Sequence, residues 1–185
     1  DSNEMCGTHI GEFDDRAIRG LAAALNADTC VLRSLSLAGN YVQQQGIHAL
    51  LEGGSQSLHS IVELNLNRNA LGDAGVEALA SRIPFLNNLA SLHLSYNQIH
   101  DPTPLTLALR TNHVVRHIFL GHNNIGDAAT TQSLVDLVDV VSNKPQFETI
   151  DLSFNELTNE HAKVIAYLCH TATPPLRSLY VEGNP

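Results

Sequence analysis

Histidine is frequent among the side chains that could do chemistry in this sequence, with ten copies in 185 residues. A zinc site needs three or four imidazole, thiolate or carboxylate groups that converge on one point. His113 and His117 are four residues apart, but they flank the start of an expected strand, where helical spacing does not apply. His93 and His117 could approach diagonally on adjacent strands, with His122 nearby, yet no carboxylate or cysteine completes a tetrahedral set. The sequence therefore predicts no metal site and no cofactor.

Motifs for nucleophilic or phosphate chemistry are missing from the sequence. It contains no Gly-x-Ser-x-Gly nucleophile turn and no Gly-x-x-x-x-Gly-Lys-Ser/Thr phosphate loop. Cys6, Cys30 and Cys169 are irregularly spaced, so they suggest neither a disulfide framework nor a Cys-x-x-Cys pair. We therefore expect a protein that is not an enzyme.

The composition is that of a folded chain with an acidic surface. Hydrophobic residues make up 43% and the formal net charge is −9. The negative charge disfavours binding to nucleic acids or anionic membranes, which requires clustered Lys and Arg, and it suits a basic protein partner. No apolar run reaches the roughly 18 residues of a membrane span, and no N-terminal targeting run or Asn-x-Ser/Thr sequon is present. These features favour a cytoplasmic protein.

A repeated pattern determines which elements must carry the histidines. The pattern is an apolar residue, two spacers and then Leu-x-Leu-x-x-Asn, with aliphatic substitutions at the leucines. The copies are Leu32, Leu35, Leu37 and Asn40; Ile61, Leu64, Leu66 and Asn69; Leu89, Leu92, Leu94 and Asn97; Val115, Ile118, Leu120 and Asn123; Phe147, Ile150, Leu152 and Asn155; Leu176, Leu179, Val181 and Asn184. The asparagines lie 29, 28, 26, 32 and 29 residues apart. A period of this length indicates a solenoid of repeated strand and helix units.

The pattern also predicts the local structure of each repeat. Leu-x-Leu has a period of two, so both leucines point inward from a short strand and the intervening residues point outward. Apolar residues at helical spacing predict helices around residues 47–51, 76–83, 134–141 and 164–168. We expect Gly72-Asp73 and Gly126-Asp127 to provide turns and helix N-caps, and Pro104 to lie in the first turn of a helix. Each recurring asparagine should bond to the backbone where the chain leaves a strand.

With the turn Asn69-Ala70-Leu71-Gly72-Asp73-Ala74-Gly75, the chain resembles the ribonuclease-inhibitor-like leucine-rich repeats, from about Met5 to Pro185. That subfamily includes the repeat domains of Ran GTPase activators and of NLR immune sensors. The resemblance implies an α/β fold: a right-handed βα solenoid, the leucine-rich repeat horseshoe, with a parallel sheet on its concave face and helices on its convex face. It implies one domain over residues 1–185 with about six repeats. Because both terminal repeats look incomplete, we expect a fragment of a longer protein.

The outward strand positions provide the candidate binding surface. Aromatic and imidazole groups accumulate there from the third repeat onward, on an otherwise polar face, as they do in protein interfaces. The predicted partner-binding residues are His93, Tyr96, His117, Phe119, His122, Asp151, Phe154 and Tyr180. Ser-Tyr-Asn and Ser-Phe-Asn are common in such repeats, so Tyr96 and Phe154 have an alternative role in shielding strand ends. Phe119 and Tyr180 lie mid-strand, where packing does not require them.

We predict a non-catalytic protein–protein interaction module that binds through the concave face and adjoining loops, as a monomer or as part of a larger chain or complex. The six strands offer roughly 300 Å² of flat face, against about 800 Å² per partner in a standard interface, so loops or further repeats should contribute. The resemblance leaves GTPase activation of the Ran activator type as an alternative, with Arg68 as its only concave arginine. Another alternative is a purely structural spacer or assembly subunit, in which no concave side chain would matter more than the others.

Overall fold

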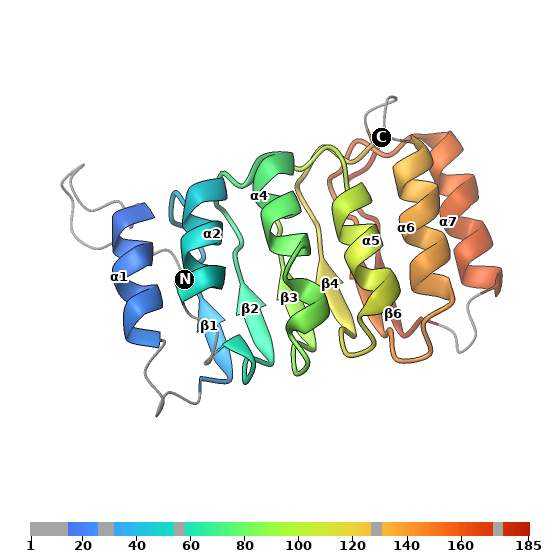
Figure 1. The fold of residues 1–185 in the computed structure, drawn as a ribbon. Coiled ribbons are helices and arrows are strands. Elements are labelled where there is room, and N and C mark those ends of the chain that lie inside the picture. Colours follow the sequence, from blue (N-terminus) through green and yellow to red (C-terminus); the bar gives the residue numbers. More distant parts are fainter. Residues whose placement is uncertain (1–14, 26–31, 54–57, 127–130, 172–175) are drawn as a thin grey trace.

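The computed structural model describes residues 15–25, 32–53, 58–126, 131–171 and 176–185. Within them, six strands form one parallel sheet in chain order: β1 Ser34–Ser36, β2 Glu63–Asn65, β3 Ser91–His93, β4 His117–Phe119, β5 Thr149–Asp151 and β6 Ser178–Tyr180. The helices are α1 Asp15–Leu25, α2 Gln44–Gly53, α4 Gly72–Ala80, α5 Thr103–Thr111, α6 Thr131–Ser142 and α7 Asn159–Thr171, with a 3₁₀ turn η1 at Ile83–Phe85. Strands and helices alternate in two layers (Figure 1). The predicted βα solenoid is confirmed.

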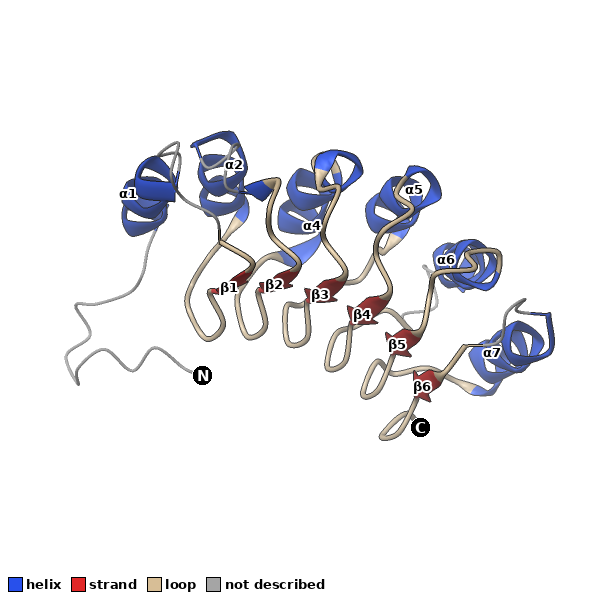
Figure 2. Ribbon diagram, turned by 90° about the horizontal axis from the view of Figure 1, so that it is seen from below, coloured by secondary structure: helices blue, strands red, loops and turns tan. Residues whose placement is uncertain are grey.

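The solenoid curves because its two layers differ in width. A helix with its side chains is about 10–12 Å across, whereas neighbouring strands are about 4.8 Å apart. The described helices lie on the outer side of the row of strands (Figure 2). The strands therefore line the concave side. None of the described helices has the length and apolar character needed to cross a membrane.

The core lies between the two layers and is almost entirely aliphatic. The middle residues of the strands are in register across the sheet: Leu35, Leu64, Leu92, Ile118, Ile150 and Leu179. The second leucine of the pattern is buried as predicted in five repeats, whereas Val181 in the last repeat is 40% exposed. The predicted helix faces also pack inward, as Ile47 and Leu50 of α2 illustrate. Ile83 is buried too, but it belongs to η1 and not to α4.

The recurring asparagines form the predicted ladder along one edge of the sheet. In the second repeat, Asn69 Nδ2 donates to the carbonyls of Leu66 and Leu37 at 2.9 and 3.0 Å. Its Oδ1 accepts the backbone N–H of Val42 in the preceding repeat. The amide thus joins the bend of its own repeat to the bend of its neighbour.

Asn97 differs from Asn69, Asn123, Asn155 and Asn184, because its buried Oδ1 has no hydrogen-bond partner among the described residues. In the other repeats the donor lies two residues after an asparagine, as Ile99 does for Asn123. The corresponding residue before Asn97 is Leu71, which has helical backbone angles of −64° and −45°. α4 begins directly after Leu71, so this turn differs from the others.

That difference corrects the predicted role of Gly72-Asp73. Gly72 is the first residue of α4, with a φ of +57°, and α4 has no side-chain cap at its N-terminus. The Asp73 carboxylate instead accepts the backbone N–H groups of His100 and Asp101 in the next repeat. Asp127 lies outside the described residues, as does Met5, near which the predicted resemblance begins. Pro104 lies in the first turn of α5, as predicted.

A lysine from one repeat caps the helix of the repeat before it. Lys144 Nζ donates to the carbonyls of Arg110 and Asn112 at the end of α5, at 2.8 and 3.0 Å. Orphan carbonyls and the negative end of the helix dipole both favour a cation there. Partial burial lowers the pKa of Lys144.

Candidate protein interface

The candidate interface lies on the face of the sheet opposite the helices. Each strand places its first and third residues on this face, because its middle residue points into the core. The parallel register sets the third residues side by side, so that His93, Phe119, Asp151 and Tyr180 follow one another on β3 to β6. His117 is the first residue of β4. We call these five residues the strand cluster.

His93 stacks on Phe119 within the strand cluster. The two ring centroids are 4.4 Å apart and the planes differ by 10°. The His93 imidazole also lies 3.1 Å from Ser91 Oγ and 3.4 Å from a Glu63 carboxylate oxygen. Burial lowers the pKa of His93, and the nearby His117 lowers it further, while Glu63 opposes both effects.

His117 and Asp151 of the strand cluster are held by short polar contacts, whereas Tyr180 is exposed. His117 Nδ1 lies 3.1 Å from Thr149 Oγ1. Asp151 Oδ1 accepts the backbone N–H of Ser153 at 2.9 Å and also the Ser153 hydroxyl. Tyr180 is 44% exposed.

Tyr96, His122 and Phe154 lie one residue before the ladder asparagines and form a second group. The His122 ring stacks on Tyr96 at 3.9 Å and on Phe154 at 4.1 Å between centroids. Arg68 occupies the same position in the second repeat, and its guanidinium carbon lies 5.1 Å from the Tyr96 ring centroid. We call these four residues the rim stack, because they follow the edge of the sheet where the chain turns away.

The backbone of the rim stack is left-handed, with φ between +51° and +61° at all four residues. Glycine, which adopts this conformation without strain, occupies the same position at Gly39 and Gly183. The Phe154 ring covers Gly183 so closely that a Cβ there would lie 2.2 Å from Phe154 Cε1. The Phe154 ring therefore packs against the turn at Gly183, a position that fits the shielding role that the sequence left open for this residue.

The eight predicted residues thus lie in two groups, five in the strand cluster and three in the rim stack. Sequence reasoning omitted Arg68 and Glu63 from the site. Aligning the repeats on the ladder asparagine would have revealed Arg68, since it then falls beside Tyr96. By the alternation of residues along the strands, Thr149, Gly121 and Ser153 should also point outward, but all three are buried. Neighbouring side chains, including Asp151, cover Gly121 and Ser153.

The described part of the chain contains no cluster of metal-ligating side chains. No group of three or more His, Cys, Asp or Glu side chains is placed to hold an ion there. Arg68, the alternative catalytic candidate, is exposed and lies over Tyr96.

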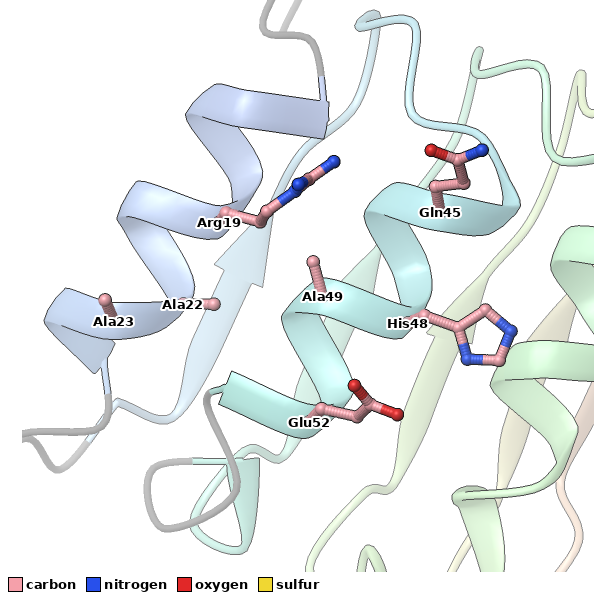
Figure 3. Close-up of a pocket in the computed structure, with 7 residues that line it drawn as sticks. All are labelled: Arg19, Ala22, Ala23, Gln45, His48, Ala49 and Glu52. Atoms are coloured by element: carbon pink, nitrogen blue, oxygen red, sulfur yellow. The ribbon is translucent and has the colours of Figure 1, made fainter.

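A surface groove of about 660 Å³ lies on the convex side, between α1 and α2 (Figure 3). Its walls include the short side chains of Ala22 and Ala49, which leave space between the helices. Arg19 extends from α1 toward α2 in this view, and Glu52 lies at the C-terminal end of α2. The groove is far from the predicted residues and its lining mixes both charges.

Comparison with known proteins places this geometry in a class. Residues 57–80 and 85–102 match a family model described as Leucine Rich repeat. The chain is 27% identical to ribonuclease inhibitor from Mus musculus, over 92% of the chain and 43% of that protein. It is 28% identical to ribonuclease inhibitor from Sus scrofa, over 98% of the chain and 39% of that protein. The chain therefore spans about two fifths of the length of these curated relatives.

Solved structures share the fold at lower sequence identity. The tropomodulin C-terminal domain of Caenorhabditis elegans aligns with a TM-score of 0.65 and 17% identity, over 85% of this chain and 93% of that one. Leiomodin-1 actin-binding site 2 aligns with a TM-score of 0.62 and 11% identity, over 85% and 88%. The chain is a leucine-rich repeat protein. Its homology to ribonuclease inhibitor is distant, and the predicted ribonuclease-inhibitor-like repeat type is confirmed.

Proposed function

We propose that this chain is a protein–protein interaction module that binds its partner through the concave face and adjoining loops and catalyses no reaction. The strand cluster carries the proposal, because it presents aromatic and imidazole rings on a sheet face that the described helices leave uncovered. Tyr180 is 44% exposed at the end of β6, on the face away from the core, where the fold does not require a ring. The names of two similar proteins, ribonuclease inhibitor and leiomodin-1 actin-binding site 2, also indicate protein ligands.

The physical basis is the energetics of interfaces. Large rings lose little side-chain entropy on binding and bury a large area, so they dominate the binding free energy of many complexes. His93 holds Phe119 in one orientation by stacking, which reduces the ordering cost further. The net charge of −9 favours a basic partner, and the irregular cysteines support a cytoplasmic location.

Affinity capture with paired variants tests the proposal. The concave variant carries Phe119→Ala and Tyr180→Ala. The control carries Phe85→Ala and Leu107→Ala, which remove convex side chains that are 59% and 57% exposed. After circular dichroism shows that all three proteins are folded, each is used as bait and the captured proteins are identified by mass spectrometry.

We expect the parent and the convex control to capture the same partner proteins, and we expect the concave variant to lose them. If the concave variant captures the same proteins as the parent, the concave proposal fails and the structural spacer becomes the better explanation. GTPase activation is tested separately, by comparing GTP hydrolysis by Ran in the presence of the parent or of Arg68→Ala. The contact of Arg68 with Tyr96 gives no specific support to that alternative.

A further inference from the structure

Phe119 has one covered face and one open face. His93 on β3 covers the first face by near-parallel stacking. The second face is therefore directed toward β5, where the register partner of Phe119 is Asp151. Neighbouring strands are about 4.8 Å apart, and an aspartate side chain is much shorter than a phenylalanine. Asp151 thus lies beside the base of the ring and leaves its outer part uncovered.

Asp151 is held in place through only one of its two carboxylate oxygens. Ser153 bonds twice to Oδ1, which fixes the plane of the carboxylate. Among the described residues, no hydrogen-bond or ion-pair partner contacts Oδ2. This oxygen lies over Gly121, where an added Cβ would be only 3.0 Å away. On the far side, Asp151 is in register with the exposed Tyr180.

We propose that Asp151, Phe119 and Tyr180 form the binding position for one arginine side chain of a basic protein partner. This inference rests on the proposed function of the concave face. A guanidinium is planar, so it can lie against the open face of Phe119 while its N–H groups donate to Asp151 Oδ2. Tyr180 then borders the guanidinium on its other side.

Other side chains fit this position less well. A carboxylate or phosphate would be repelled by Asp151. An apolar side chain would bury Oδ2 without a hydrogen-bond donor, which is unfavourable. A lysine ammonium could pair with the carboxylate, but it has no planar surface to match the ring.

Binding of small probes to the full chain tests this assignment by NMR. The probes are the capped tripeptides Gly-Arg-Gly, Gly-citrulline-Gly and Gly-Lys-Gly. Citrulline has nearly the shape of arginine but carries no charge. We expect saturable shifts of the backbone amide signals of Phe119, Asp151 and Tyr180 with the arginine probe. The citrulline and lysine probes should bind about tenfold and severalfold more weakly, respectively.

Two variants localise the effect. Asp151→Asn keeps an oxygen that can accept from Ser153 and should weaken the arginine probe about tenfold. Glu52→Gln removes the same charge from α2 on the convex side and should leave the dissociation constant unchanged. Equal binding of the arginine and citrulline probes, unchanged binding by Asp151→Asn, or shifts only at other residues would overturn the assignment.

The capture experiment separates this inference from the function on which it rests. If partners are lost by Phe119→Ala with Tyr180→Ala but fully retained by Asp151→Asn, the interaction module stands and the arginine position is wrong. If neither variant loses a partner that the parent captures, the concave function itself fails.

Discussion

The ladder asparagines allow the same substitution to be compared in two adjacent repeats. Asn123 Oδ1 accepts two backbone N–H groups, those of Asn97 and Ile99, at 2.9 and 3.1 Å. Asn97 Oδ1 accepts none from the part of the chain that the structure describes. Replacing either asparagine by alanine removes a similar buried volume. The difference in the free energy of unfolding between the two variants therefore reports the cost of leaving the N–H groups of Asn97 and Ile99 without an acceptor.

The carbonyls contribute little to that difference, because each keeps a second donor. Without Asn97, the Leu66 carbonyl still accepts from Asn69 Nδ2. The Leu94 carbonyl is shared by the amides of Asn97 and Asn123, so it keeps one donor in either variant. The loss of Asn97 therefore strands no backbone group in this part of the ladder.

We expect Asn123→Ala to lower the free energy of unfolding by about 2–6 kcal/mol more than Asn97→Ala, because each of the two buried, unpaired N–H groups costs about 1–3 kcal/mol. Equilibrium unfolding in urea, followed by circular dichroism, measures both values. The slope of the unfolding free energy against urea concentration must be the same for both variants. A different slope would indicate that part of the solenoid unfolds separately. Equal losses, or a greater loss for Asn97→Ala, would refute the hydrogen-bond reasoning.

Three further predictions concern single side chains. Lys144→Met should lower the free energy of unfolding by about 1–2 kcal/mol through loss of the α5 cap, whereas Lys163→Met, in an exposed ion pair with Glu160, should change it by less than about 0.5 kcal/mol. Gly183→Ala should lower the melting temperature, because φ is +70° and Phe154 fills the space; Gly20→Ala in α1, where the space is open, should not. The pKa of His93 is below its ordinary value of 6.5, so the folded state binds fewer protons than the unfolded state and stability should fall as the pH drops through 6.5 and below. In the His93→Gln variant, the free energy of unfolding measured in urea should therefore decrease less between about pH 7 and pH 5.

The sequence predicted the fold well because one physical requirement repeats six times. Every copy needs two inward aliphatic residues and one amide at the bend, and a pattern with a period near 29 residues shows both. The helix starts were harder. Gly72-Asp73 has the composition of a turn and cap, but the early start of α4 and the bonds of Asp73 to the next repeat depend on tertiary context.

The sequence predicted on which face of the sheet the candidate residues lie, but not which side chains contact one another. Alternation places Phe119 and Tyr180 on the open face, and the structure agrees. The aligned repeats already pair His93 with Phe119 on neighbouring strands, but the stacking of the two rings depends on their side-chain torsion angles, which a sequence pattern does not contain. The burial of Ser153 was missed for a similar reason, since it follows from the orientation of Asp151.

The rim stack links the backbone of the turn to recognition. A residue other than glycine in a left-handed conformation is strained by about 1–2 kcal/mol, and each ring contact returns about 0.5–1.5 kcal/mol. The two effects nearly cancel, so glycine would serve the fold at these positions about as well, as it does at Gly39 and Gly183. The planar side chains therefore add a property other than stability: a row of rings held parallel beside the strand cluster, 3.9–4.1 Å apart in its central part. A surface already ordered in this way loses little entropy when a partner binds. We accordingly expect Tyr96 and Phe154 to shield the turns and to contact the partner with the same rings.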